Sequence, residues 1–175
     1  MQDGFIQIYT GEGKGKTTAA LGLAFRAAGR KKKVLFVQFL KGIHTGEEIS
    51  MNENEYIEHL KLSETVRFFN KLAPEEQAEL KARTEKEWGS LIERIETSPL
   101  DVLVLDEIMI AISHGLIEES DVIKLLNNKP QKLEVILTGR YTSDHLIENA
   151  DLVTEMKKLK HYYDKGVTSR LGIEY

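Results

Sequence analysis

The chain contains short runs rich in apolar and β-branched residues, separated by longer segments of mixed polarity. The runs occupy residues 5–9, 34–37, 102–105 and 133–137, and a shorter one lies at 152–153. Continuous apolar runs without strict alternation are typical of strands that are buried on both faces of a parallel sheet. The pattern therefore predicts an α/β fold in which helices cover both faces of a mostly parallel sheet.

Two of the intervening segments predict helices, and another predicts a loop. Residues 16–28 are rich in Ala and Leu, which favour helix, and Gly29 then provides a stop. Residues 42–63 are rich in Glu and Asn, so we expect a loop that becomes ordered only when a ligand binds. A long helix is expected from Pro74, because proline suits the first helical turn. Its buried face is predicted from residues at helical spacing, namely Leu80, Thr84, Trp88, Leu91 and Ile95.

Composition and charge narrow the class of protein. The 175 residues include 24 Lys and Arg against 28 Asp and Glu, which gives a formal net charge of −4. This length suits a single domain spanning 1–175, and a mildly acidic chain argues against nucleic-acid binding. No apolar run is long enough to cross a bilayer and no signal-peptide pattern opens the chain, so we expect a cytoplasmic protein without a membrane partner. The absence of cysteine excludes a disulfide scaffold, a thiolate metal site and a cysteine nucleophile.

A glycine-rich stretch lies between the first predicted strand and the first predicted helix. Its glycines let backbone N–H groups turn inward around an anion, and the helix N-terminus adds positive potential. The Lys16 ammonium is placed to reach phosphate oxygens, and the Thr17 hydroxyl is placed to bind Mg²⁺. The usual motif has glycine at the position of Thr10. We predict a nucleoside triphosphate site formed by Thr10, Gly11, Glu12, Gly13, Lys14, Gly15, Lys16, Thr17 and Thr18.

Two carboxylates, Asp106 and Glu107, directly follow the predicted strand 102–105. In proteins with such a loop, an acid at the end of a neighbouring strand positions Mg²⁺ directly or through water. The spacing does not say which carboxylate contacts the metal, so both join Thr17 as candidate ligands. A glutamate here would also align water or an alcohol, so a RecA-like ATPase or a small-metabolite kinase is an alternative. A nucleotide-gated binding module that uses 42–63 as a switch is a third hypothesis.

Several polar and aromatic residues near strand ends are further candidates. Gln38 and Lys41 follow the second strand and are predicted to face the nucleotide crevice, the alternative being a solvated loop. Arg140 follows the fourth strand, where it would reach phosphate or form a salt bridge that caps a helix. Phe68 and Phe69 are either core strand residues, which is the default interpretation, or the wall of an apolar substrate pocket.

Additional strings place the chain near a known family. After the loop come Ala-Leu-Gly-Leu-Ala-Phe-Arg-Ala-Ala-Gly, Val-Gln-Phe-Leu-Lys-Gly and Val-Leu-Val-Leu-Asp-Glu. Towards the C-terminus come Leu-Thr-Gly-Arg, Leu-Ile-Glu-Asn-Ala-Asp-Leu-Val-Thr-Glu-Met, Lys-His-Tyr-Tyr and Gly-Ile-Glu-Tyr. In this order they resemble the P-loop type of ATP:corrinoid adenosyltransferase, from residue 5 to residue 175. The C-terminal strings are the more specific ones, since the loop alone indicates only an NTPase.

The resemblance implies a P-loop NTPase (RecA-like) three-layer fold and a particular reaction. Members transfer the 5′-deoxyadenosyl group of ATP to the cobalt of a reduced cob(I) corrinoid and release triphosphate, in adenosylcobalamin biosynthesis or corrinoid salvage. The implied substrates are ATP with cob(I)alamin or cobyrinic acid a,c-diamide. Mg²⁺, a reductase that supplies the electron and a homodimer are implied as well.

The same resemblance assigns roles to individual residues. Lys16, Thr17 and Glu107 are the implied catalytic residues, and the triphosphate is expected to lie in the loop in reversed polarity, with C5′ exposed to the corrin. The family often has Gly-Phe-Thr-Trp where this chain has Val-Arg-Phe-Phe, a segment thought to crowd the lower face of cobalt. Phe68 and Phe69 are therefore expected in the corrinoid pocket, together with His161.

Overall fold

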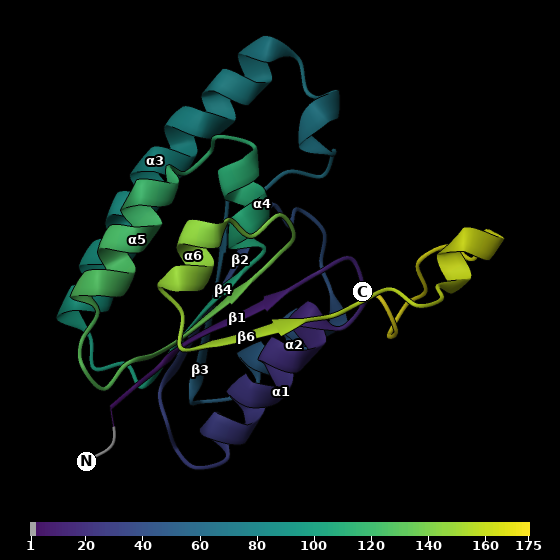
Figure 1. Ribbon diagram of the computed structural model, residues 1–175. Helices are drawn as coiled ribbons and strands as arrows, with labels where there is room; N and C mark the ends of the chain where they lie inside the picture. The colour runs from purple at the N-terminus through teal and green to yellow at the C-terminus, as the bar shows by residue number, and fades with distance from the viewer. Residues whose placement is uncertain (1–2) are drawn as a thin grey trace.

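Among residues 3–175, which the computed structural model describes, a six-stranded parallel sheet forms the centre of the molecule (Figure 1). The strands are β1 (Ile6–Thr10), β2 (Val34–Phe39), β3 (Ile57–Leu62), β4 (Val102–Asp106), β5 (Glu134–Thr138) and β6 (Leu152–Glu155). Their order across the sheet is β3-β2-β4-β5-β1-β6. Because all pairs are parallel, the carboxyl ends of all strands meet at one edge of the sheet.

Helices cover both faces of this sheet (Figure 1). One face packs against α1 (Lys16–Ala28) and α2 (Gly46–Asn52). The other packs against α3 (Pro74–Thr97), α4 (Ile108–Ser113), α5 (Glu119–Asn128) and α6 (Asp144–Glu148). Single turns of 3₁₀-helix, η1 (Phe69–Lys71) and η2 (Tyr162–Lys165), lie before α3 and after β6.

The central strands explain the apolar runs in the sequence. Every residue of β2 and of β4 is buried, as expected for strands covered on both faces. The helix α1 has its predicted bounds, and all the residues predicted for the inner face of α3 are buried. The predicted α/β fold with a parallel sheet flanked by helices is confirmed.

The loop predicted for residues 42–63 is wrong. This segment contains α2 and the edge strand β3, which pairs in parallel with β2. Only the ends of β3, Ile57 and Leu62, are buried, so the strand lacks a continuous apolar run. Its polar residues instead find partners on neighbouring elements: Lys61 Nζ donates to Glu48 Oε2 of α2 at 2.6 Å, and Glu58 forms an ion pair with Arg94 of α3. Secondary structure therefore forms here through pairing and ion pairs rather than through a hydrophobic pattern.

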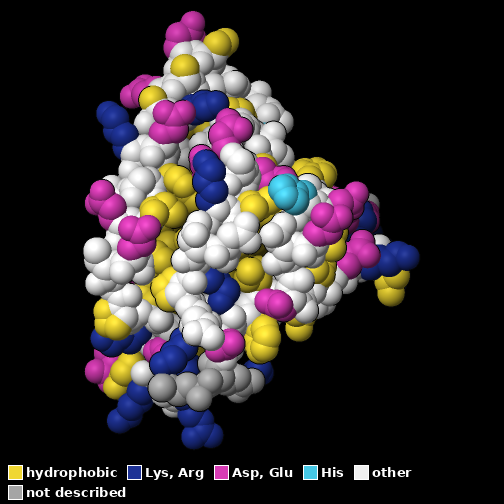
Figure 2. Space-filling view, turned by 60° about the vertical axis from the view of Figure 1, so that its left-hand side comes forward, with side chains coloured by type: hydrophobic (Ala, Val, Ile, Leu, Met, Phe, Trp, Pro, Cys, Tyr) yellow, Lys and Arg dark blue, Asp and Glu magenta, His cyan; other side chains and the backbone are white. Residues whose placement is uncertain are grey.

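The outer surface mixes charges of both signs. On the face shown in Figure 2, Lys and Arg side chains are interspersed with Asp and Glu, and apolar side chains are visible between them. No helix within residues 3–175 is long and apolar enough to cross a membrane. Beyond β6 the chain leaves the body of the molecule as an arm that carries η2, and it then turns back so that the C-terminus lies beside the body (Figure 1).

Candidate functional site

The glycine-rich loop joins β1 to α1 at the carboxyl edge of the sheet. Gly11 and Gly15 have φ angles of 100° and 123°, a region that side chains with Cβ avoid. Gly13 donates its N–H to the Met156 carbonyl at 2.6 Å, and a Cβ on Gly13 would lie 2.6 Å from that same oxygen. The loop therefore takes its shape from glycine and from close packing against the chain that follows β6.

The Lys16 ammonium is held inside the loop. Its Nζ donates to the carbonyl oxygens of Gly11 at 2.7 Å and Gly13 at 2.9 Å, and the residue is only 6% exposed. Burial lowers the pKa of Lys16 below its ordinary value of 10.5. A cation that has lost its water but has no carboxylate partner within bonding distance is a strong binding group for an incoming anion.

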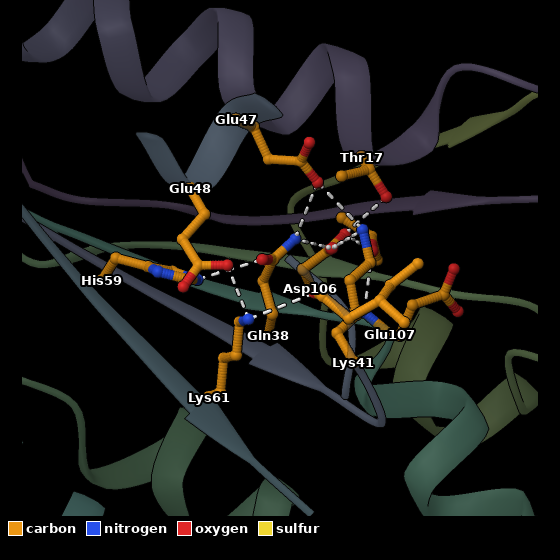
Figure 3. Close-up of polar contacts among 11 residues, drawn as sticks. Thr17, Gln38, Lys41, Glu47, Glu48, His59, Lys61, Asp106 and Glu107 are labelled. Atoms are coloured by element: carbon orange, nitrogen blue, oxygen red, sulfur yellow. Dashed lines mark hydrogen bonds and ion pairs between the residues drawn. The ribbon is translucent and has the colours of Figure 1, made fainter. Parts of the chain in front are cut away.

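The Asp106 carboxylate, at the end of β4, joins the loop to two neighbouring strands (Figure 3). Its Oδ1 accepts hydrogen bonds from the hydroxyls of Thr17, at 2.8 Å, and Thr138, at 2.6 Å. Its Oδ2 accepts from Gln38 Nε2 at 3.1 Å and lies 3.9 Å from Lys41 Nζ. Asp106 is fully buried, so this network fixes the start of α1 relative to β2, β4 and β5.

Glu107 leaves the strand in a different direction. Its backbone is left-handed, with φ 64°, which costs a non-glycine residue about 1–2 kcal/mol. The Glu107 N–H donates to Thr138 Oγ1 at 3.0 Å, which secures this turn. In Figure 3 its carboxylate points away from that of Asp106. Burial, and then the charge of Asp106, raise the pKa of Glu107 above its ordinary 4.5.

The oxygen ligands offered by the start of α1 and the end of β4 suit Mg²⁺ bound together with a phosphate chain. Thr17 offers a hydroxyl oxygen, and Asp106 and Glu107 offer carboxylate oxygens. Within residues 3–175, no group of His, Cys, Asp and Glu side chains is close enough to hold a metal by itself. Mg²⁺ in phosphate sites needs no such cage, because phosphate and water supply most of its ligands. The residues present therefore fit the ion.

A cavity of about 410 Å³ opens above the loop. Arg140 stands on its wall and forms an ion pair of 2.9 Å with Glu12 of the loop. Three residues that were predicted to bind nucleotide do not line this cavity: Thr10, Gly11 and the fully buried Gln38. The solvated-loop alternative does not hold for Gln38, which belongs to β2, whereas Lys41 lies in the loop after β2 with 24% of its side chain exposed and lines the cavity. Predicted residues that the structure does bring to the wall are Glu12, Gly13, Lys14, Gly15, Lys16, Thr17, Thr18, Lys41, Glu107 and Arg140.

The C-terminal tail closes one side of this cavity, a feature that the residue-by-residue prediction missed. Lys14 Nζ donates to Glu174 Oε1 at 2.7 Å and to the Tyr162 hydroxyl at 2.9 Å. Hydrogen bonds from Arg170 and then Lys14 hold the pKa of Glu174 far below its usual range. The signal in the sequence is the terminal string Gly-Ile-Glu-Tyr, which indicates the family but by itself assigns no role to Glu174.

A second cavity, of about 390 Å³, adjoins the first. Lys41, Glu107, Glu174 and Tyr175 line both cavities. The remaining wall of the second cavity is mostly apolar and includes Phe39, Leu40, Ile43, Val66, Phe68, Phe69 and Ile110.

Phe68 and Phe69 are not core strand residues, so the default interpretation is wrong. Phe68 is 79% exposed, and Phe69 belongs to η1, where its ring stacks on His114 with 4.6 Å between centroids. Both lie on the wall of the second cavity. The structure places His161 elsewhere, at the nucleotide-side cavity, where its Nδ1 accepts from the Tyr163 N–H.

The strand order, the glycine-rich loop and the acidic end of β4 define a P-loop nucleotide-binding protein. A solved structure agrees with this fold: "EssC (ATPases 2 and 3)" from Geobacillus thermodenitrificans matches with a TM-score of 0.53. That match covers 97% of this chain and 35% of the longer EssC chain. At 15% sequence identity it supports the fold alone.

The chain belongs to the ATP:corrinoid adenosyltransferase family. The family model described as "ATP:corrinoid adenosyltransferase BtuR/CobO/CobP" matches residues 2–175. A "Corrinoid adenosyltransferase" of Escherichia coli (strain K12) is 34% identical, over 98% of this chain and 86% of its own length. A protein of the same name from Sinorhizobium is 35% identical, over 99% of this chain and 81% of its own. "Corrinoid adenosyltransferase CobA" of Salmonella typhimurium is 34% identical, over 98% and 86%.

Proposed function

We propose that this chain transfers the 5′-deoxyadenosyl group of ATP to cob(I) corrinoid, with nucleotide in the first cavity and corrinoid in the second. The observation that carries the proposal is that a phosphate-binding cavity and an apolar cavity share part of one wall. Lys41 and Glu107 belong to that shared wall. Such a junction lets two bound substrates meet without either leaving its own site.

The reaction requires alignment rather than proton transfer. The electron pair of cob(I) attacks C5′ of ATP, so a Co–C bond forms while the C5′–O bond breaks and its electrons leave with triphosphate. No proton moves in this step, so no general base is needed. The chain's contribution is to point C5′ at the second cavity and to stabilise charge on the departing oxygen. A triphosphate held in the loop in reversed polarity would meet both demands.

The residues that would stabilise the triphosphate surround the loop. Lys16 would exchange its carbonyl partners, Gly11 and Gly13, for phosphate oxygens. Arg140 would add a second cation by leaving Glu12. The N–H groups at the start of α1 add the positive end of the helix dipole. A triphosphate would offer each of these groups stronger, charge-assisted hydrogen bonds than its contacts within the protein.

We include Mg²⁺ in the proposal as a cofactor held by Thr17 and Asp106, with Glu107 on the cavity wall as the alternative carboxylate ligand. The ion would neutralise charge on the triphosphate. Asp106 also accepts a hydrogen bond from the Thr17 hydroxyl, which leaves the hydroxyl lone pairs free to face a cation. The family resemblance further supports a homodimer and an electron-supplying reductase as partners.

The proposal is tested anaerobically with protein, Mg²⁺, ATP and chemically reduced cobalamin. The cobalamin spectrum and the phosphate product are followed in the same sample. We expect adenosylcobalamin and triphosphate in equal amounts, and neither without protein. Release of ADP with an unchanged corrinoid spectrum would overturn the proposal and favour the ATPase or kinase alternative.

A further inference from the structure

A histidine on the edge strand, His59, is linked to Asp106 by hydrogen bonds through one intermediate side chain, that of Gln38. His59 lies in β3, beside Phe36 of β2 in the sheet register. Its Nε2 is 3.0 Å from Gln38 Oε1 (Figure 3). Gln38 is fully buried, so both ends of its amide depend on protein partners for hydrogen bonds.

The neighbours of Gln38 determine how its amide is oriented. Its other end lies 3.1 Å from Asp106 Oδ2 and 3.4 Å from Glu47 Oε1. Burial would raise the pKa of Glu47, but its own backbone N–H and Lys41 outweigh burial and hold that pKa below 4.5. Carboxylate oxygens accept hydrogen bonds, and Asp106 already accepts two at its other oxygen, so the NH₂ group of Gln38 must face Glu47 and Asp106.

This orientation leaves the carbonyl oxygen of Gln38 facing the histidine, which must therefore donate. Burial lowers the pKa of His59 below its ordinary 6.5, which favours the neutral ring. The charges of Glu48, Lys61, Glu47 and Lys41 act on the ring with opposing signs. A neutral ring that donates from Nε2 carries its proton there and leaves Nδ1 as the acceptor.

We infer that His59 is a positioning residue that acts through Gln38 to hold Asp106 ready for Mg²⁺ and ATP. The hydrogen bonds run in one direction, from His59 to Gln38 and from Gln38 to Asp106. Asp106 in turn orients the Thr17 hydroxyl. Without the histidine donor, the buried carbonyl of Gln38 has no hydrogen-bond partner. The orientation that directs the NH₂ group of Gln38 to Asp106 is then no longer stabilised.

The test compares two substitutions at the same position. His59→Leu removes the donor and puts an apolar side chain in its place. His59→Gln keeps an N–H donor at the same number of bonds from Cα as Nε2 of histidine. We expect the Kd for ATP measured with Mg²⁺ to rise about tenfold in His59→Leu and to stay within about twofold in His59→Gln. Binding of ATP without Mg²⁺ is expected to change far less. His145→Leu, which alters an exposed histidine, serves as the matched control and should bind like the wild type.

Nitrogen-resolved NMR of the wild-type imidazoles supplies a readout independent of any variant. We expect the Nε2–H tautomer for His59, and an Nδ1–H tautomer would overturn the inference. Equal losses in His59→Leu and His59→Gln, or no loss in His59→Leu, would overturn it too. The inference rests on the proposed nucleotide site, but binding is measured without corrinoid. A wild-type chain that binds MgATP but transfers no adenosyl group would refute the proposed reaction and leave the role of His59 standing.

Discussion

Thr17 and Asp106, 89 positions apart in the sequence, are joined by a hydrogen bond of 2.8 Å from the threonine hydroxyl to the aspartate carboxylate. The bond ties the first turn of α1 to the end of β4. It also directs the hydroxyl proton to Asp106, so that the lone pairs of Thr17 are free for a cation. The position of the Thr17 hydroxyl is therefore set by a strand that lies far from it in the sequence.

Thr17→Ala should raise the Mg²⁺ concentration required for half-maximal activity about tenfold, because it removes a hydroxyl that binds the ion and a partner of Asp106. Thr17→Ser keeps the hydroxyl and should titrate close to wild type. The measurement is turnover against Mg²⁺ at saturating ATP. Identical magnesium curves for Thr17→Ala and wild type would argue that Thr17 does not bind the metal.

Lys16→Met should lower kcat at least about 100-fold, since a preorganised charge facing the leaving group is commonly worth that much. The folded state should tolerate this change, because the ammonium is desolvated and its pKa is lowered by burial. We expect the free energy of unfolding to stay within about 1 kcal/mol of wild type. Chemical denaturation beside single-turnover kinetics separates the two effects, and near-normal turnover would remove Lys16 from the mechanism.

Phe68→Ala should raise KM for the corrinoid and leave the Kd for MgATP unchanged, because Phe68 lies on the wall of the second cavity only. Phe68 is 79% exposed, so removal of its ring should not destabilise the fold. Steady-state kinetics with each substrate varied in turn make the measurement. An equal effect on both substrates would contradict the assignment of separate cavities.

Glu48→Gln should lower stability at pH 7 by about 1 kcal/mol, the upper end for a surface ion pair, because the side chains of Lys61 and Glu48 are only 11% and 14% exposed. Lys61 holds the pKa of Glu48 below its ordinary 4.5. A depressed carboxyl pKa contributes stability above 4.5 that disappears as pH falls through the folded-state value. The difference between variant and wild type should therefore vanish in acid. Denaturant titrations at pH 7 and pH 3 provide the check, and a difference that grows in acid would have the wrong sign.

Gly89→Ala should raise the free energy of unfolding by about 1 kcal/mol, because Gly89 is exposed within α3 and an added Cβ would contact nothing outside its own helix backbone. Gly13→Ala should do the opposite, since its Cβ would meet the Met156 carbonyl at 2.6 Å. It should also weaken ATP binding by displacing the loop. Thermal unfolding of both variants tests the pair, and a shift of Tm in the same direction for both would be inconsistent with this packing.

Most of the fold followed from local patterns. The apolar runs predicted five of the strands to within two residues, and the Ala-rich segment gave the bounds of α1. The loop at residues 10–18 was predicted because glycines, lysine and threonine must be adjacent in the chain to form a phosphate site. These features depend on neighbouring residues, so the sequence carries them directly.

The tertiary structure decided which segments, far apart in the sequence, become neighbours. It turned residues 42–63 into α2 and β3, because pairing with β2 and ion pairs to α2 replaced the missing apolar pattern. It buried Gln38 between His59 and Asp106, and it brought Glu174 onto Lys14. The sequence by itself determined every strand except β3, together with α1, the onset and buried face of α3, and the phosphate loop, each from residues close in the chain. The shared wall and the histidine contact depend on segments far apart in the chain, whose proximity only the folded sheet establishes.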